Sequence, residues 1–555
     1  MNLRIFKPRL ILSTAVFFWL MAQLDTGLET RLAIINANII TLSSKIPFAQ
    51  AMVIEGDRII YVGSTKEARH SCGAQCWILD LNGLTVVPGF IDNHTHMLEG
   101  GFYYLQPNLY GKTCQEIVEI IKREVAKSQP DELIFAHSWD YGFCPQPHRK
   151  LLDPVSPQNP VLLVQYGGHA VWVNSYFLNK LGITADTQAP SGGEIERDAQ
   201  GNPTGILKEK SAESAQIKAF LSLNRRQRKK ALEKALELFR QAGITSVQDN
   251  TWDPRVVWAL TELKKEGKLT CRVTCWALGE MWYGPALMKI ARYDSKWIRL
   301  GPVKLFADGA FSSKTAWMSQ PYYGEPDNYG IPRHSPEELK RLVFKFAKNK
   351  RQIAVHSIGD RAVNEVLNAI EQAQAHYPWV KNLRFRIEHC QMVLPEDIKR
   401  FKELGVLASV QPFALRDPEK DIRILGKERA EEAYPYLSLL KAGAVVSFGS
   451  DFPAEIDYNP LLGIYYATTR KSKDGKSGPL KPAECFTPEQ ALRAYTINSA
   501  YAEFTEKEKG TLEPGKLADF VVLSENLLKV SPEKIKDIKV LYTFVGGRQV
   551  YPEIY

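Results

Sequence analysis

Hydrophobic and polar residues alternate over short stretches near both ends of the chain. Residues 31–63 contain R-L-A-I-I-N-A-N-I-I-T-L and A-M-V-I-E-G-D-R-I-I-Y-V-G, and residues 517–523 and 539–551 return to the same pattern. A period of two between turn residues is typical of short antiparallel strands. We therefore expect a small composite β-sandwich domain built from both termini, residues 23–83 plus 510–555, which brings the chain ends together.

The middle of the chain alternates short apolar runs with amphipathic helical stretches, which is typical of a parallel α/β fold. Eight runs are candidate strands: Thr85–Asp92, Ile244–Asn250, Cys271–Ala277, Pro302–Phe306, Gln352–His356, Leu383–His389, Val406–Gln411 and Ala444–Gly449. Helical stretches lie between most of them: Arg226–Ala242, Pro336–Lys350, Asp360–His376, Pro395–Leu404 and Lys427–Ala442. Eight strands with interposed helices predict an α/β fold of the (β/α)8 TIM-barrel type over residues 84–509.

The gap between the first two candidate strands, about residues 97–225, is far longer than a βα loop needs, so we expect an inserted subdomain after strand 1. Most aromatic side chains of such a subdomain form its own core, and the remainder can wall a substrate pocket. The aromatic residues concerned are Tyr103, Tyr104, Trp139, Tyr141, Phe143, Trp172 and Tyr176.

Composition and charge exclude several classes of protein. The 555 residues are 45% hydrophobic and 24% charged, which is ordinary for a globular protein and excludes a disordered chain or a multi-span membrane protein. The net charge of +9 comes from interspersed residues of both signs, and the chain has no zinc-finger spacing, phosphate-binding Gly-rich loop or internal repeat. Nucleic acid is therefore not an expected partner.

The N-terminus carries a separate signal. Arg4, Lys7 and Arg9 precede an apolar run, Leu10–Ala22, that is too short to span a bilayer comfortably. We interpret residues 1–22 as a secretory signal peptide, which predicts an exported protein, periplasmic or secreted. The alternative is an uncleaved membrane anchor, because L-M-A at residues 20–22 is a poor cleavage site.

Export would permit disulfides. Cys72 and Cys76 form the one candidate pair that this reasoning offers. Cys271 and Cys275 would lie on one face of a strand about 13 Å apart, which is too far for a disulfide. Cys390 is expected to be a buried free thiol.

Histidines and one aspartate lie where candidate strands end. V-P-G-F-I-D-N-H-T-H closes on His94 and His96, which along an extended chain lie about 7 Å apart on one face and can hold a metal together. An isolated H-x-H is equally compatible with ordinary loop histidines. His356, His389 and Asp451, however, each end a different strand, and the strand ends of a barrel converge on one catalytic face.

Two of these positions have their own alternatives. Asp451 by itself reads as a helix N-cap before the turn at Pro453, and the strand-end position is what favours a role in the site. Lys304 occupies the corresponding place on the fourth strand. A free ammonium would repel a metal, but a lysine amine that carries a carboxylate from carbon dioxide becomes a bridging oxygen ligand.

The motif series resembles the amidohydrolase superfamily and, within it, the YtcJ-like branch of amidohydrolase family 3. Beside P-G-F-I-D-N-H-T-H stand S-G-G-E-I-E-R-D-A-Q-G-N-P-T-G-I-L, V-K-L-F-A-D-G-A, V-H-S-I-G-D-R-A, R-I-E-H-C-Q, S-F-G-S-D-F-P, A-Y-T-I-N-S-A-Y and G-T-L-E-P-G-K-L-A-D-F-V-V-L. The agreement runs from about Ile34 to about Gly547. The resemblance implies a distorted TIM barrel with a small composite β domain, one or two divalent metals, usually zinc, and hydrolysis of a carbon–nitrogen bond in an amide-like substrate.

The resemblance also implies roles for individual residues. Lys304 would be an N6-carboxylysine bridge, and Asp451 both a metal ligand and the general base. His169 is expected to face the substrate as a hydrogen-bond donor, although Gly167 stands where family members carry an aspartate. The implied metal ligands are His94, His96, Lys304, His356, His389 and Asp451.

The expected substrate is a small amide-like molecule, such as an N-acyl or N-substituted formamide compound. The same site could hydrolyse a cyclic amide, a carbamate or an ester, and a second alternative is an inactive exported binding protein. A membrane is an expected partner only if the N-terminal segment stays uncleaved, and a homodimer is left open.

Overall fold

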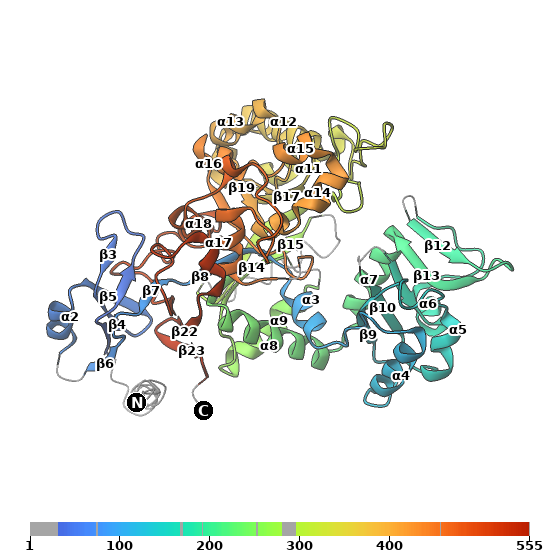
Figure 1. The fold of residues 1–555 in the computed structure, drawn as a ribbon, viewed down its shortest axis with the longest axis horizontal. Helices are drawn as coiled ribbons and strands as arrows, with labels where there is room; N and C mark the ends of the chain where they lie inside the picture. Colours follow the sequence, from blue (N-terminus) through green and yellow to red (C-terminus); the bar gives the residue numbers. More distant parts are fainter. Residues whose placement is uncertain are drawn as a thin grey trace. The chain divides into compact units, whose positions relative to one another are not determined.

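The computed structural model describes residues 31–73, 76–166, 170–190, 193–250, 253–279, 296–455 and 457–553. They form two compact units (Figure 1), one with residues 31–96, 236–250 and 269–553 and the other with residues 97–235 and 253–268, each with the gaps just given. Within the described ranges, no helix is long and apolar enough to cross a membrane. The predicted signal segment at residues 1–22 lies outside these ranges.

Eight parallel strands form the central sheet of the first unit, and neighbouring strands follow the order of the chain. Their lengths range from three residues in β20 to nine in β16, as in a distorted barrel. This arrangement confirms the predicted (β/α)8 fold class. The strands are β8 (Phe90–Thr95), β14 (Ile244–Asp249), β15 (Arg272–Leu278), β16 (Ile298–Phe306), β17 (Ile353–Ser357), β18 (Arg386–His389), β19 (Leu407–Val410) and β20 (Val446–Phe448).

The first and last strands of this sheet approach each other just beyond β20. The N–H of Asp451 donates to the carbonyl of His94 over 2.6 Å, and the N–H of His96 donates to the carbonyl of Phe452 over 2.8 Å. A Cβ at Gly449 would lie 2.5 Å from the amide nitrogen of His94, so this approach requires glycine. The segment that carries Asp451 is therefore bonded directly to the strand that carries His94 and His96.

Helices connect the strands of this sheet. Helix α11 shows why the sequence forms them: Ser335 and Glu338 make a capping box at its start, and Leu339, Val343 and Phe346 form a buried face at helical spacing. Helix α12 packs against α11, α13 and β17 (Figure 1). The helices are α8 (Arg225–Gln241), α11 (Pro336–Lys348), α12 (Asp360–His376), α13 (Pro395–Leu404), α14 (Pro418–Leu425), α15 (Lys427–Glu432), α16 (Tyr436–Lys441), α17 (Pro460–Thr469), α18 (Pro488–Ala494) and α19 (Ile497–Ala502).

The single helix predicted over Lys427–Ala442 is wrong. The chain forms two short helices instead, α15 and α16, separated by Ala433, Tyr434 and Pro435. Tyr434 adopts a left-handed backbone with φ 58°, and proline lacks the N–H that a continuous helix needs. Both features interrupt the helical hydrogen-bond ladder.

The candidate strand Thr85–Asp92 also divides. Its first half is β7 (Thr85–Pro88), which pairs with β2 and β21 in a different sheet, and its second half starts the barrel as β8. The break falls at Gly89, where a Cβ would lie 2.2 Å from the side-chain oxygen of Thr245. The apolar run is continuous in sequence, but the two halves belong to two sheets.

Strands from both ends of the chain build two further sheets in the first unit. A four-stranded sheet has the order β5-β4-β1-β6, and a six-stranded sheet has the order β23-β22-β21-β7-β2-β3. One hydrophobic cluster contains buried residues from both sheets, such as Ile34, Phe520 and Phe544. The strands are β1 (Arg31–Ile35), β2 (Asn38–Ile40), β3 (Phe48–Ala49), β4 (Ala51–Glu55), β5 (Arg58–Gly63), β6 (Cys76–Asp80), β7, β21 (Phe520–Leu523), β22 (Val540–Val545) and β23 (Arg548–Tyr551).

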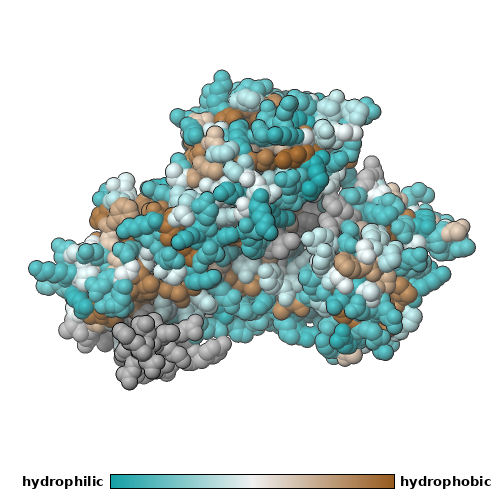
Figure 2. Space-filling view, viewed as in Figure 1, coloured by the Kyte–Doolittle hydropathy of each residue, from teal (hydrophilic) through white to brown (hydrophobic). Residues whose placement is uncertain are grey.

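The visible surface is mainly hydrophilic, with scattered hydrophobic patches (Figure 2). Phe48 in β3, Ile60 in β5 and Ile78 in β6 are exposed hydrophobic residues.

The second unit holds a five-stranded sheet of order β12-β13-β11-β10-β9. Of the aromatic residues predicted there, Trp139 and Trp172 belong to its buried core, whereas Tyr104, Tyr141 and Phe143 are exposed. Its elements are α3 (Met97–Tyr104), α4 (Cys114–Val125), β9 (Ile134–Trp139), α5 (Arg149–Leu152), β10 (Val161–Gln165), β11 (Ala170–Val173), α6 (Ser175–Leu181), β12 (Gly193–Arg197), β13 (Pro203–Glu209), α7 (Lys210–Ser222) and α9 (Val256–Lys265).

Two disulfides are present among the described residues. The predicted pair Cys72–Cys76 is bonded, and a second disulfide, which the sequence reasoning missed, joins Cys114 to Cys144. The thirty-residue spacing of the second pair gave no signal, because only the fold brings the two Cα atoms to 4.7 Å. Cys390 is a buried free thiol, as expected, and Cys271 and Cys275 are not bonded to each other, as their predicted separation implies; both are also free and buried.

Candidate metal centre

Four imidazole rings from three strand ends gather in the first unit. The ring centre of His94 lies 5.7 Å from that of His96 and 5.2 Å from that of His389. The rings of His389 and His356 are 4.3 Å apart. These residues come from the carboxyl ends of β8, β18 and β17, so the fold brings together histidines that lie nearly three hundred positions apart in sequence.

Asp451 joins this group. Its Oδ1 atom lies 3.2 Å from His96 Nε2 and 3.4 Å from His94 Nε2. One potential ligand atom from each of His94, His96 and Asp451 lies within 4.8 Å of the others. Two imidazole nitrogens and a carboxylate oxygen are a donor set that fits a divalent cation such as zinc. The N-cap alternative does not apply, because Asn459 caps the next described helix, α17.

Lys304 in β16 also reaches the group. Its Nζ atom lies 3.3 Å from His94 Nε2, and the side chain is buried. Burial, only partly opposed by the nearby Glu388 and Asp451 carboxylates, lowers the pKa of Lys304 to about 8. The lowered pKa increases the fraction of neutral amine, which is the form that reacts with carbon dioxide.

His94 is oriented by a buried ion pair. Its Nδ1–H donates to Glu388 Oε2 over 2.7 Å, and Arg386 donates from Nε to the other oxygen of that carboxylate over 2.8 Å. Burial and the Lys304 charge lower the pKa of His94 to about 4, so the ring is neutral at pH 7 and its Nε2 keeps a lone pair. Burial opposes ionisation of Glu388, but the Arg386 charge and the His94 hydrogen bond outweigh it and hold the pKa of this carboxyl well below its usual range.

Two of the other three rings, those of His389 and His356, are held by neutral acceptors. His389 Nδ1–H donates to Gln411 Oε1 over 2.7 Å, and His356 Nε2–H donates to the carbonyl of Gly309 over 2.9 Å. Burial lowers the pKa of His389 to about 3 and that of His356 well below its usual value. Each ring therefore has its second nitrogen free as an electron-pair donor.

Asp451 is ionised despite its surroundings. Burial would raise its pKa, but the imidazoles of His94, His96 and His389 outweigh burial and hold the pKa of this carboxyl well below its usual value. The side chains of His96 and Asp451 retain 14% and 15% exposure, whereas that of His94 has none. Solvent therefore reaches the group from the side of His96 and Asp451.

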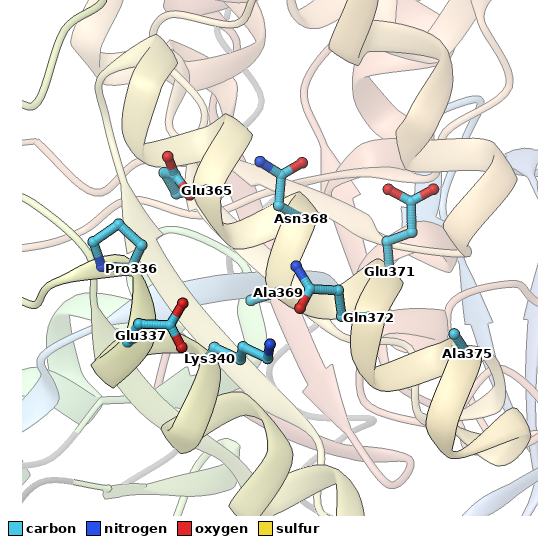
Figure 3. A pocket seen from close by; sticks show the side chains of 9 residues that line it. All are labelled: Pro336, Glu337, Lys340, Glu365, Asn368, Ala369, Glu371, Gln372 and Ala375. Atoms are coloured by element: carbon cyan, nitrogen blue, oxygen red, sulfur yellow. The ribbon is translucent and has the colours of Figure 1, made fainter.

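The remaining sequence-predicted site residue, His169, lies outside the described residues. A groove of about 340 Å³ runs elsewhere, between α11 and α12, and Figure 3 shows that its labelled side chains come from these two outer helices. It shares no residue with the histidine group. We therefore place the candidate site at the strand ends and not in this groove.

Sequence reasoning missed three residues that hold the histidines in place: Arg386, Glu388 and Gln411. The first two stand in the motif R-I-E-H directly before His389, so a charged pair in a buried strand was an available signal. Gln411 follows β19 and carries no such signal, because glutamine is mostly exposed and its burial here cannot be read from the sequence.

A parallel eight-stranded barrel with histidines, a lysine and an aspartate at its strand ends defines the class of metal-dependent hydrolases. The chain belongs to the amidohydrolase family, whose profile matches residues 78–551. It is therefore a hydrolase that acts on carbon–nitrogen bonds other than peptide bonds, which confirms the resemblance of its motifs.

Several known proteins are similar to this chain over nearly its whole length. Protein LONG AFTER FAR-RED 3 of Arabidopsis thaliana is 34% identical, with 95% of this chain and 92% of that protein covered. The putative amidohydrolase YtcJ of Bacillus subtilis is 32% identical (91% and 98% covered), and the N-substituted formamide deformylase of Arthrobacter pascens is 29% identical (93% and 97% covered). The crystal structure of an uncharacterized metal-dependent hydrolase from Pyrococcus horikoshii superposes with a TM-score of 0.77 at 28% identity, covering 90% of this chain and 99% of that one.

Proposed function

We propose that this amidohydrolase uses zinc to hydrolyse an N-acyl or N-substituted formamide compound. The observation that carries the proposal is the convergence of His94, His96 and Asp451, with one ligand atom each within 4.8 Å. The similarity to an N-substituted formamide deformylase over 93% of this chain supports the choice of substrate class. Zinc is favoured because nitrogen and carboxylate donors together suit it.

Six residues would hold the metal in this proposal: His94, His96, Lys304, His356, His389 and Asp451. When bound, the cation supplies a Lewis acid that lowers the pKa of a water molecule from 15.7 to about 7. Lys304 would act as an N6-carboxylysine, because its lowered pKa increases the fraction of neutral amine and its Nζ atom lies beside His94.

The chain's own proton carrier in the reaction would be Asp451. Its carboxylate is ionised and partly open to solvent, so it can accept a proton from the attacking water. It then delivers this proton to the nitrogen as the carbon–nitrogen bond breaks. A formamide and one water thus give formate and the amine, and His169 stays our sequence prediction for a donor to the carbonyl oxygen.

We further propose that the protein is exported, with residues 1–22 as signal peptide or, if uncleaved, as membrane anchor. Two disulfides support this, because disulfides persist mainly in oxidising compartments. Expression of the full chain with a C-terminal tag, followed by cell fractionation and N-terminal sequencing, tests it. Recovery of the intact chain in the cytoplasm would contradict export.

A substrate panel tests the function. The protein is purified without chelator, its metal is measured by mass spectrometry, and N-substituted formamides, N-acyl amino acids, hydantoins and esters are compared by kcat/KM. We expect about one or two zinc ions per chain and release of formate and amine in equal amounts. A metal-loaded protein that prefers a hydantoin or an ester would contradict the substrate class, and a protein that retains no metal would contradict the site.

A further inference from the structure

Gln411 lies at the candidate metal centre, although no metal-ligand role falls to it. It is the residue that follows β19, and its side chain is buried, with 1% exposure. Its Oε1 atom lies 2.7 Å from His389 Nδ1. An amide oxygen only accepts, so His389 carries its proton on Nδ1 and presents Nε2 as an electron-pair donor.

A second acceptor competes for the same proton. Asp451 Oδ2 lies 4.0 Å from His389 Nδ1. Without Gln411, the Asp451 carboxylate would be a nearby acceptor for the Nδ1–H. Gln411 therefore keeps Asp451 available for the metal and for the proton of the attacking water.

The other end of the Gln411 amide has no partner. Its buried Nε2 atom makes no hydrogen bond to any of the described residues. A buried donor left unpaired destabilises the fold, and more than about 90% of buried polar groups in native proteins are paired. Because Nε2 shares an amide carbon with Oε1, this unpaired donor lies beside the histidine group.

We propose that Gln411 has two roles: Oε1 positions His389, and Nε2 donates a hydrogen bond to the carbonyl oxygen of the substrate. The second role rests on the proposed function. As the water oxygen bonds to the carbonyl carbon, the C=O π bond opens and its electron pair moves to the oxygen. Nε2–H stabilises this negative charge until the C=O bond re-forms and the amine leaves with the proton held by Asp451.

Two substitutions separate the roles. Gln411→Glu keeps an acceptor for His389 Nδ1–H but removes the donor, whereas Gln411→Leu removes both. Metal affinity is measured by chelator competition, and kcat and KM are measured at saturating metal. Gln372→Glu, in the groove between α11 and α12 (Figure 3), is the control for an added negative charge outside the site.

We expect Gln411→Leu to weaken metal binding by about 10- to 100-fold, the usual effect of losing a residue that orients a histidine ligand. Gln411→Glu should keep metal affinity within a few-fold, yet lower kcat by about 10²- to 10³-fold with little change in KM. Unchanged metal affinity in Gln411→Leu would overturn the positioning role. Unchanged kcat in Gln411→Glu would overturn the donor role.

A binding measurement tests the donor role of Gln411 independently of whether the proposed substrate class is correct. The side-chain amide signals of Gln411 are identified in ¹⁵N spectra by their loss in Gln411→Glu, and the zinc-loaded protein is titrated with formate as a carboxylate probe. We expect these signals to shift at saturation while those of Gln372 do not. Absence of a shift overturns the donor role, whereas failure of the wild-type protein to cleave any formamide overturns only the substrate class.

Discussion

The buried pair of Glu388 and Arg386 offers the sharpest test of how His94 is held. Glu388 accepts three hydrogen bonds: from Arg386 Nε at 2.8 Å, from Arg386 Nη2 at 3.1 Å and from His94 Nδ1 at 2.7 Å. Both acid and guanidinium side chains have 0% exposure. In Glu388→Gln only one oxygen remains, so the new amide N–H₂ must face an N–H donor of Arg386 or of His94.

Two magnitudes follow from this geometry. Breaking a buried ion pair by removing one partner costs about 3–5 kcal/mol, because the other charge stays buried without compensation. Arg386 keeps hydrogen bonds to the carbonyl of Asn93 and the hydroxyl of Ser409, which places the expected loss of unfolding free energy near the lower end, at about 3 kcal/mol. Loss of the residue that orients His94 should weaken metal binding by about 10- to 100-fold.

The assay separates the two effects. Urea unfolding of the metal-free protein measures stability without the contribution of bound metal, and chelator competition measures metal affinity. Glu371→Gln is the matched control, because Glu371 pairs with Arg400 on the outer helices with 60% of the acid exposed, and such pairs contribute about 0–1 kcal/mol. The double variant Glu388→Gln, Arg386→Met should recover part of the lost stability. Equal urea midpoints and equal metal affinities for Glu388→Gln and wild type would refute the reasoning.

Three further outcomes are expected. Asp451→Asn should lower turnover by about two or more orders of magnitude through loss of the proton carrier, and retained turnover in a steady-state assay would mean that another group is the base. Lys304→Ala should lower both metal content and activity without rescue by bicarbonate, and unchanged activity would remove this residue from the site. Cys114→Ser with Cys144→Ser should lower the free energy of unfolding by about 3–4 kcal/mol for a sequence separation of 30 residues, against about 2 kcal/mol for the separation of 4 in the other disulfide. Equal urea midpoints for the two disulfide-free variants would contradict this dependence on loop length.

Most of the barrel could be predicted because its signals are local. Buried parallel strands read as short apolar runs, and helices such as α11 and α12 begin and end where periodicity and capping residues indicate. The error at Thr85–Asp92 arose because a local pattern continues across a tertiary boundary. The residues before and after Gly89 are mostly apolar, because β7 and β8 are both buried in their sheets. Hydrophobicity therefore cannot mark the change from β7 to β8.

The residues of the candidate site also differ in how far the sequence predicts them. Histidines at strand ends can be read from the sequence, but the residues that orient them depend on backbone geometry. Alternation along β18 would place Glu388 and His389 on opposite faces of the sheet. Instead His389 takes a left-handed φ of 77°, which turns its ring back toward the side of Glu388, and both residues reach the same group.

Asp451 has the same kind of backbone, with φ 57°. A left-handed non-glycine residue costs of order 1–3 kcal/mol and persists only where surrounding bonds fix it. Here the N–H of Asp451 is held by the carbonyl of His94, and the residue after His389 donates its N–H to the carbonyl of Ser357. Asp451 is thus hydrogen-bonded to a predicted metal ligand, His94. The residue after His389 is hydrogen-bonded to Ser357, which directly follows another predicted ligand, His356. Because the strain is imposed by partners on other strands, the sequence can name the ligand-type residues but cannot show which way they face.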